Sequence, residues 1–328
     1  MKKSLVALAA LAVVGAASAQ SAVTLSGNYG AGYLSTEING VKNKGIALTA
    51  ATLKVGVTED LGSGLKAAVN MQFDSYGSSS TQNFAQALLR RNTSISLTGG
   101  FGQVRFDNTR SGNLLTRGMV GPVNLDQGIY DTTNVITRSA VDALTYGMAV
   151  GDFTGYAQYV EAAADGATTP AAKVVVLGAG YAKGPIAAGL AYKMYDYSGA
   201  LAFLDAGATE ATRSNRLEAF ATYDFGVAKI GVGFDGKNVG KTAVVVPGFT
   251  ETATDRSNAY SLGVSAPLGP VTLGVNFAKR GDFKVTELGA NYNLSKRTAL
   301  TAGYGRHTAD EGNGLSGDQY LVAMTHSF

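Results

Sequence analysis

The feature that most constrains this chain is a repeated two-residue alternation of apolar and polar side chains. In segment 65–74, Leu65, Val69 and Phe73 fall on one parity, and the charged and amide side chains fall on the other. The same alternation recurs in segments 23–33, 52–58 and 320–328. A strand points successive side chains to opposite faces, so these segments predict strands with one apolar and one polar face. A helix fits them poorly, because each glycine inside would cost about 1 kcal/mol relative to alanine.

Two kinds of connection alternate along the chain. Short links rich in Gly, Pro and Asp lie at 59–64, 99–102, 183–185, 224–226, 266–270 and 293–296. Long polar links lie between them, at 75–86, 108–134, 162–172, 198–212, 239–254 and 308–316. An even number of antiparallel strands joined alternately by short turns and long loops is typical of a transmembrane β-barrel. The 309 residues after residue 19 provide roughly 19 residues for each of about sixteen strands with its share of the links, so the sequence predicts an all-β, 16-stranded antiparallel barrel.

Composition narrows the functions open to the chain. It has no cysteine, which excludes a disulfide scaffold, a cysteine-ligated zinc, an iron–sulfur cluster and a thiol nucleophile. The formal charge of +3 and the absence of a Lys/Arg block do not favour nucleic acid as a partner. Neither a glycine-rich phosphate loop nor a zinc-ligand spacing is present in the sequence, so we expect no cofactor and no metal. Beyond residue 19, no apolar run approaches the ~20 residues of a membrane-spanning helix.

The first 19 residues have the three parts of a secretory signal peptide. Lys2 and Lys3 form a basic start, an uncharged apolar run follows, and Ala17-Ser18-Ala19 supplies a small-x-small cleavage pattern. We therefore expect cleavage after Ala19 and a single domain over 20–328. A buried N-terminal helix of a cytosolic domain fits this three-part pattern much less well.

The period alone does not separate a membrane barrel from a soluble β-sandwich. Two further features favour the barrel. The polar faces are dominated by Gly, Ser, Thr, Asn and Gln, as expected of a water-filled lumen. Aromatic residues recur near the predicted strand ends, as in interfacial girdles: Tyr29, Tyr33, Phe73, Tyr146, Tyr156, Tyr159, Tyr223, Phe225 and Tyr292.

An ordered series of sequence blocks resembles the Gram-negative general porins of the betaproteobacterial (Burkholderia/Neisseria) type. The blocks are QSAVTLSG at 20–27, TEDLGSGLKA at 58–67, Arg90-Arg91 with SLTGGFGQV at 96–104, NLSKRT at 293–298 and the terminal HSF at 326–328. The resemblance implies a homotrimeric, 16-stranded outer-membrane barrel whose third extracellular loop folds inward. It implies passive passage of ions and small hydrophilic solutes. It also implies that Phe328 is an assembly signal read by the barrel-assembly machinery.

In this family, basic residues on the wall face acidic residues of the third loop across a constriction. The wall candidates lie on the polar parity or at the base of that loop: Lys54, Lys66, Arg90, Arg91, Arg105 and Arg138. Arg90 and Arg91 are adjacent, so a regular strand directs only one of them inward. The acidic candidates, on a loop spanning 108–137 that also carries Arg110 and Arg117, are Asp126 and Asp131. The chain departs from the family at Asp107-Asn108, where relatives have Gly-Arg, and at Thr52, where they have arginine.

The excess of basic candidates predicts a mild preference for anions. A substrate-selective channel for a small anionic solute is the main alternative. A barrel hydrolase is a weaker one, because it depends on pairing His307 with Asp310, and a histidine at the mouth is more often a solvated loop residue. A soluble binding or adhesive β-protein is the remaining alternative.

Overall fold

The computed structural model describes residues 21–38, 40–74, 89–110, 113–123, 140–163, 170–196, 213–236, 257–281, 283–308 and 316–328. These residues form sixteen strands and one short 3-10 helix, η2 (Leu115–Gly118). The strands are β1 (Ala22–Ile38), β2 (Val41–Gly62), β3 (Leu65–Asp74), β4 (Leu89–Gly99), β5 (Gly102–Arg110), β6 (Ala140–Val150), β7 (Phe153–Ala163), β8 (Pro170–Lys183), β9 (Ile186–Asp196), β10 (Arg213–Asp224), β11 (Lys229–Asp235), β12 (Ala259–Leu268), β13 (Val271–Arg280), β14 (Phe283–Asn293), β15 (Thr298–Thr308) and β16 (Gly317–Ser327).

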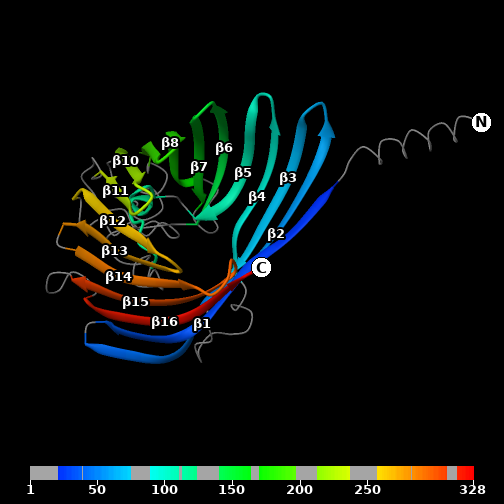
Figure 1. Ribbon diagram of the computed structural model, residues 1–328. Coiled ribbons are helices and arrows are strands. Elements are labelled where there is room, and N and C mark those ends of the chain that lie inside the picture. Colours follow the sequence, from blue (N-terminus) through cyan, green and yellow to red (C-terminus); the bar gives the residue numbers. More distant parts are fainter. Residues whose placement is uncertain are drawn as a thin grey trace, which may run out of the picture.

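The sheet closes on itself as a barrel. Each strand pairs antiparallel with its neighbours in sequence, and β1 pairs with β16 to complete the circle. In Figure 1 the red β16 lies beside the blue β1. At this seam the backbone N–H of Gly27 donates to the carbonyl of Phe328, and that of Phe328 donates back to Gly27, both at 3.0 Å. The prediction of a 16-stranded antiparallel barrel is confirmed.

The apolar parity of the strands faces outward. Leu25 and Val322 are each 63% exposed, and large apolar side chains are exposed along the strands on every side of the barrel. The opposite parity points inward and includes Asn276 and Gln319, which are 1% and 0% exposed. A soluble sandwich would bury its apolar faces against a second sheet, so this arrangement excludes that alternative. An outward apolar band around a polar interior is the arrangement of a membrane barrel.

Short and long connections alternate along most of the chain, but there are three tight turns that were not predicted, and two of them break the alternation. One of them, Gly151-Asp152, joins β6 and β7 at the short-turn end. The other two, at 39–40 between β1 and β2 and at 281–282 between β13 and β14, lie at the long-loop end. Gly40 and Gly281 have φ values of 80° and 55°, a conformation that glycine adopts without strain. Asn39-Gly40 and Gly281-Asp282 are dipeptides typical of two-residue hairpin turns, but every predicted link was three residues or longer.

Part of the interior is apolar, although the inward parity was expected to be polar throughout. A cluster of buried residues lines the inner face of β12–β16 and includes two residues of segment 113–123. Its members are Leu115, Val123, Ala259, Ala278, Phe283, Val285, Leu321 and Ala323. The inner wall is apolar here because chain, rather than water, lies against it. Within the described residues, no helix has the length and hydrophobicity needed to cross a membrane.

Candidate pore constriction

Segment 113–123, in the link between β5 and β6, docks on the inner wall of the barrel. Its helix η2 packs on β10, β11 and β12, and appears in Figure 1 as a teal turn beside them. Three hydrogen bonds fix its first half to the wall. The side chain of Asn113 donates to Asp235 at 3.1 Å, the backbone N–H of Leu114 donates to Glu218 at 3.1 Å, and Ser261 donates to the Leu115 carbonyl at 2.6 Å.

A single buried amide fixes the second half of the segment. Asn276 on β13 accepts a hydrogen bond from the Gly121 backbone N–H at 2.7 Å and donates to the Val123 carbonyl at 3.0 Å. The same side chain donates to Glu287 at 2.9 Å. Because a buried backbone group left without a partner costs about 1–3 kcal/mol, these contacts are what allow the segment to lie inside the barrel.

Inward-facing glycines give the segment the space it occupies. A Cβ on Gly233 would lie 2.3 Å from the Leu115 carbonyl oxygen, and one on Gly263 would lie 2.3 Å from the Val120 nitrogen. Equally close contacts with the segment arise for Gly231 on β11, Gly274 on β13 and Gly289 on β14. We call these five residues the glycine track. Along this track the segment packs directly against the backbone of the wall. A residue with a side chain at any of the five positions would collide with the segment.

A buried ion-pair network lies beneath the first half of the segment. Asp235, which is fully buried, accepts hydrogen bonds from both Arg216 on β10 and Arg280 on β13. Glu218 is 1% exposed and lies 2.6 Å from the ammonium group of Lys193 on β9. Each carboxylate therefore holds a wall cation together with a donor of the docked segment. Removing one partner of such a buried pair typically costs about 3–5 kcal/mol, because the other charge is left buried without compensation.

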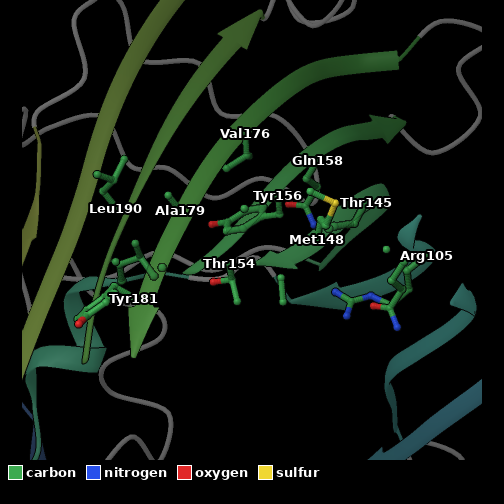
Figure 2. Close-up of a pocket in the computed structure, with 18 of the residues that line it drawn as sticks. Arg105, Thr145, Met148, Thr154, Tyr156, Gln158, Val176, Ala179, Tyr181 and Leu190 are labelled. Carbon is green, nitrogen blue, oxygen red and sulfur yellow. The ribbon is translucent and has the colours of Figure 1, made fainter. Parts of the chain in front are cut away.

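A cavity of about 1300 Å³ extends from β5 to β10 on the side that the segment faces. Figure 2 shows Arg105, Thr145 and Gln158 on successive strands of its wall. They form one hydrogen-bonded row: Gln158 donates to Thr145 at 2.9 Å, and both Thr145 and Arg105 donate to Asp107. The basic side chains lining the cavity are Arg105, Arg117 and Lys193.

Two of the sequence-predicted wall residues come together. Lys54 on β2 and Asp107 on β5 line a recess of about 220 Å³, and Arg105 pairs with that same Asp107 at 2.7 Å. Lys66 is separate from them. Lys54 pairs in register with Gln72, and Lys66 lies six residues from Gln72 toward the short turn, which is about 20 Å along β3.

The other predicted residues are described in part or not at all. Phe73 pairs with Arg90 and Gln72 pairs with Asn92, so the ladder skips Arg91 at a bulge. The strand is therefore irregular at the arginine pair, and only the backbone of these two residues is described. Arg138, Asp126 and Asp131 lie outside the described residues.

The docking network was not predicted from the sequence, and one histidine lies in a different environment from the one expected. Arg216 and Glu218 stand on one parity of β10, a pattern visible in the sequence, but their partners Asp235 and Arg280 follow only from strand register. His307 was expected to be solvated at the mouth. It is instead 5% exposed on the inner face of β15, and Asp310 lies outside the described residues. In the part of the chain described, no group of acidic or histidine side chains is arranged to hold a metal.

The glycine track leads to a direct test. Gly263→Ala places a methyl group against the Val120 nitrogen and the Gly118 carbonyl, which should weaken docking of the segment by about 1–3 kcal/mol. We expect larger and noisier single-channel currents in a planar bilayer. The control is Gly147→Ala, also inward-facing, where the nearest atom would be 3.7 Å away. If the two variants conduct alike, the track does not determine where the segment lies.

Comparison with known proteins identifies the family. The family model described as Gram-negative porin matches residues 5–312. Outer membrane porin protein 32 of Delftia acidovorans is 32% identical over 334 residues, which cover 92% of this chain and 88% of the relative. An anion-selective porin from Comamonas acidovorans has a TM-score of 0.63 at 22% identity, covering 94% of this chain and all of that one.

A second solved structure has the same fold at lower identity. The trimer form of OmpT from Vibrio cholerae has a TM-score of 0.62 at 13% identity, covering 94% of this chain and 99% of that one. The sequence blocks, the closed sixteen-stranded barrel and these matches agree. The chain belongs to the Gram-negative porin family, and it is an outer-membrane channel rather than an enzyme.

Proposed function

We propose that the protein is a general diffusion porin with a mild preference for anions. The observation that carries the proposal is a closed barrel whose docked segment faces a cavity with a net positive lining. Arg105, Arg117 and Lys193 line it, and two of the three are paired with carboxylates, Arg105 with Asp107 and Lys193 with Glu218. Positive groups at a narrow point raise the local concentration of anions. The Comamonas relative is anion-selective, which supports extending that preference to this chain.

The constriction is formed, in this proposal, by basic wall residues facing the third loop. Lys54 and Arg105 are its central members, because they share Asp107 on one stretch of wall. The remaining members are those implied by the family resemblance: Arg90, Arg91, Arg138 and Lys66 on the wall, and Asp126 and Asp131 on the loop. Lys66 contributes least, because it lies near the short turn and beyond the ~10 Å screening distance at 0.1 M salt.

Reversal potentials in a salt gradient test this proposal. The unmodified protein should prefer anions at 0.1 M KCl and lose most of that preference at 1 M, where the screening length falls to ~3 Å. Lys54→Glu should move the reversal potential toward cations, and Lys66→Glu should move it much less because it lies about 20 Å away along β3. Cation preference of the unmodified protein, or equal shifts in the two variants, would contradict the assignment.

The proposed partners are outer-membrane lipid, two further copies of the chain and the barrel-assembly machinery. OmpT, which shares the fold, forms a trimer, and a homotrimer is proposed here on that likeness. Phe328 is proposed as the assembly signal. It is 48% exposed, and its backbone bonds with Gly27 at the seam, so it is both accessible and part of barrel closure.

Deleting Phe328 distinguishes its proposed role as an assembly signal from its role in closing the barrel between β1 and β16. The deletion removes two hydrogen bonds between backbone groups, each worth about 0.5–1.5 kcal/mol, from a sheet held by sixteen strand pairings. The yield of refolded protein in detergent should therefore decrease little, whereas the amount of protein in the outer membrane of cells should decrease severely. Phe328→Tyr, which keeps an aromatic ring, is the control. Equal loss in both assays would assign Phe328 to seam stability alone.

The proposed mature chain is a single barrel domain over 20–328, with residues 1–19 removed on export. The intact mass of protein extracted from outer membranes should match a chain beginning at Gln20. The same gene product recovered from cytoplasmic inclusion bodies, where no signal peptidase acts, should retain Lys2 and Lys3. A retained leader in the outer-membrane form would overturn the predicted cleavage site.

A further inference from the structure

Arg117 is exposed in the barrel interior at the end of η2. Its guanidinium carbon lies 5.4 Å from the ring centroid of Phe220 on β10, within the range of a cation–π contact. A guanidinium stacked on a ring by one face keeps the N–H groups at its edge free to bind a carboxylate, a phosphate or a halide. Because the side chain also lines the large cavity, those N–H groups are within reach of solutes there.

The ring that supports Arg117 is itself held in place. A Cβ on Gly189 of β9 would lie 2.7 Å from the Phe220 ring, so the ring rests directly on this glycine. Tyr156 on β7 rests in the same way on Gly178 of β8. Both rings line the cavity, and Arg117 lies over Phe220; we call the two rings the aromatic floor.

The backbone that carries Arg117 is fixed on both sides. Leu115 is fully buried, and its N–H donates to the Asn113 side chain at 2.8 Å. The N–H of Arg117 donates to the Leu114 carbonyl at 3.0 Å, and Gly118 lies against the backbone of Val232 on β11. The cation is consequently presented at one position in the cavity.

Charge pairing distinguishes Arg117 from the other cations of the cavity. Arg105 pairs with Asp107, and Lys193 pairs with Glu218. Asp152, another carboxylate among the described residues of the cavity wall, pairs with Lys183 at 2.8 Å. Among the described residues, no such ion pair is formed by Arg117. A charge that is already paired contributes little field to a passing ion, whereas the charge of Arg117 contributes all of its own.

We propose that Arg117 is a selectivity-determining residue of this channel and coordinates small anions, inorganic ions and carboxylates alike, as they pass the docked segment. The proposal deepens the anion preference above and rests on it. In this channel the third loop contributes a positive charge to the pathway, in addition to the acidic residues that family resemblance places on it. The aromatic floor and the docking network act as positioning groups for that charge.

Three variants test the proposal by reversal potential in a KCl gradient at 0.1 M. Arg117→Gln removes the charge, and Arg117→Lys keeps it without the planar stack. The matched control is Lys279→Gln, which changes the net charge equally on the outward face of β13, opposite the exposed Tyr260. At 0.1 M salt, a unit charge about 6 Å from a passing ion raises the local concentration of anions and lowers that of cations about twofold each, so the ratio of the two changes about threefold to fourfold. We expect Arg117→Gln to lower the anion-to-cation permeability ratio by about threefold, and Arg117→Lys and Lys279→Gln to leave it nearly unchanged.

The outcomes separate this inference from the proposed function. One outcome is that the unmodified channel prefers anions while Arg117→Gln changes the reversal potential no more than Lys279→Gln does. In that case the inference is wrong and the porin assignment stands. An equal loss of selectivity in Arg117→Lys and Arg117→Gln would also overturn it, because the role would then be structural rather than electrostatic. If the unmodified protein forms no anion-preferring channel, the proposed function fails first. Replacing chloride by acetate tests whether a carboxylate is preferred to a halide at the same position.

Discussion

The constraint on which the rest of this molecule depends is that backbone polar groups in a membrane find partners only within the protein. An open sheet fails this requirement at two edges, and the pairing of β1 with β16 removes both. Closure continues to the last residue, since Phe328 still bonds with Gly27. A closed sheet whose apolar parity faces lipid must turn its polar parity inward. The lumen is thus a consequence of closure, and a channel is what this sequence pattern produces.

The same constraint governs the segment that enters the lumen. Chain packed against the inner wall loses water on that side, so its N–H and carbonyl groups need partners on the wall. Asn276 supplies a donor and an acceptor from one side chain, and Glu218 and Ser261 supply one contact each. The glycine track lets the backbone approach closely enough for these bonds to form. Polar residues spaced among glycines on β10–β14 therefore act as a dock, and Asp235 and its two arginines strengthen it.

The fold could be predicted from the sequence, but the place on the wall where segment 113–123 docks could not. Strand positions followed from a period that depends only on which residues alternate, as in 65–74, and the long links followed from local composition. The tight turns at Gly40 and Gly281 were not predicted because a two-residue link is shorter than the links that local composition indicated. The partner of segment 113–123 escaped for another reason: parity tells which residues face inward, but not which strand a distant loop will meet. Lys54 and Lys66 illustrate the same limit. Both lie on the polar parity of their strands, and only the strand register shows that they lie far apart along the wall.

Electrostatics in the lumen depends on pairing more than on the number of charges. Counting basic residues in the sequence weighted Arg105 and Lys54 equally, yet Arg105 forms an ion pair with Asp107, at a position where the family resemblance implies glycine. At Thr52, where the family resemblance implies arginine, the side-chain hydroxyl donates a hydrogen bond to Asp74 at 2.9 Å. On the opposite side, buried carboxylates absorb the charges of Arg216, Arg280 and Lys193. These cations serve to hold the loop, because a buried ion pair presents almost no net charge to the pathway. The electric field that a solute meets in the lumen is thus set by the few charged side chains that are not paired in the docking network.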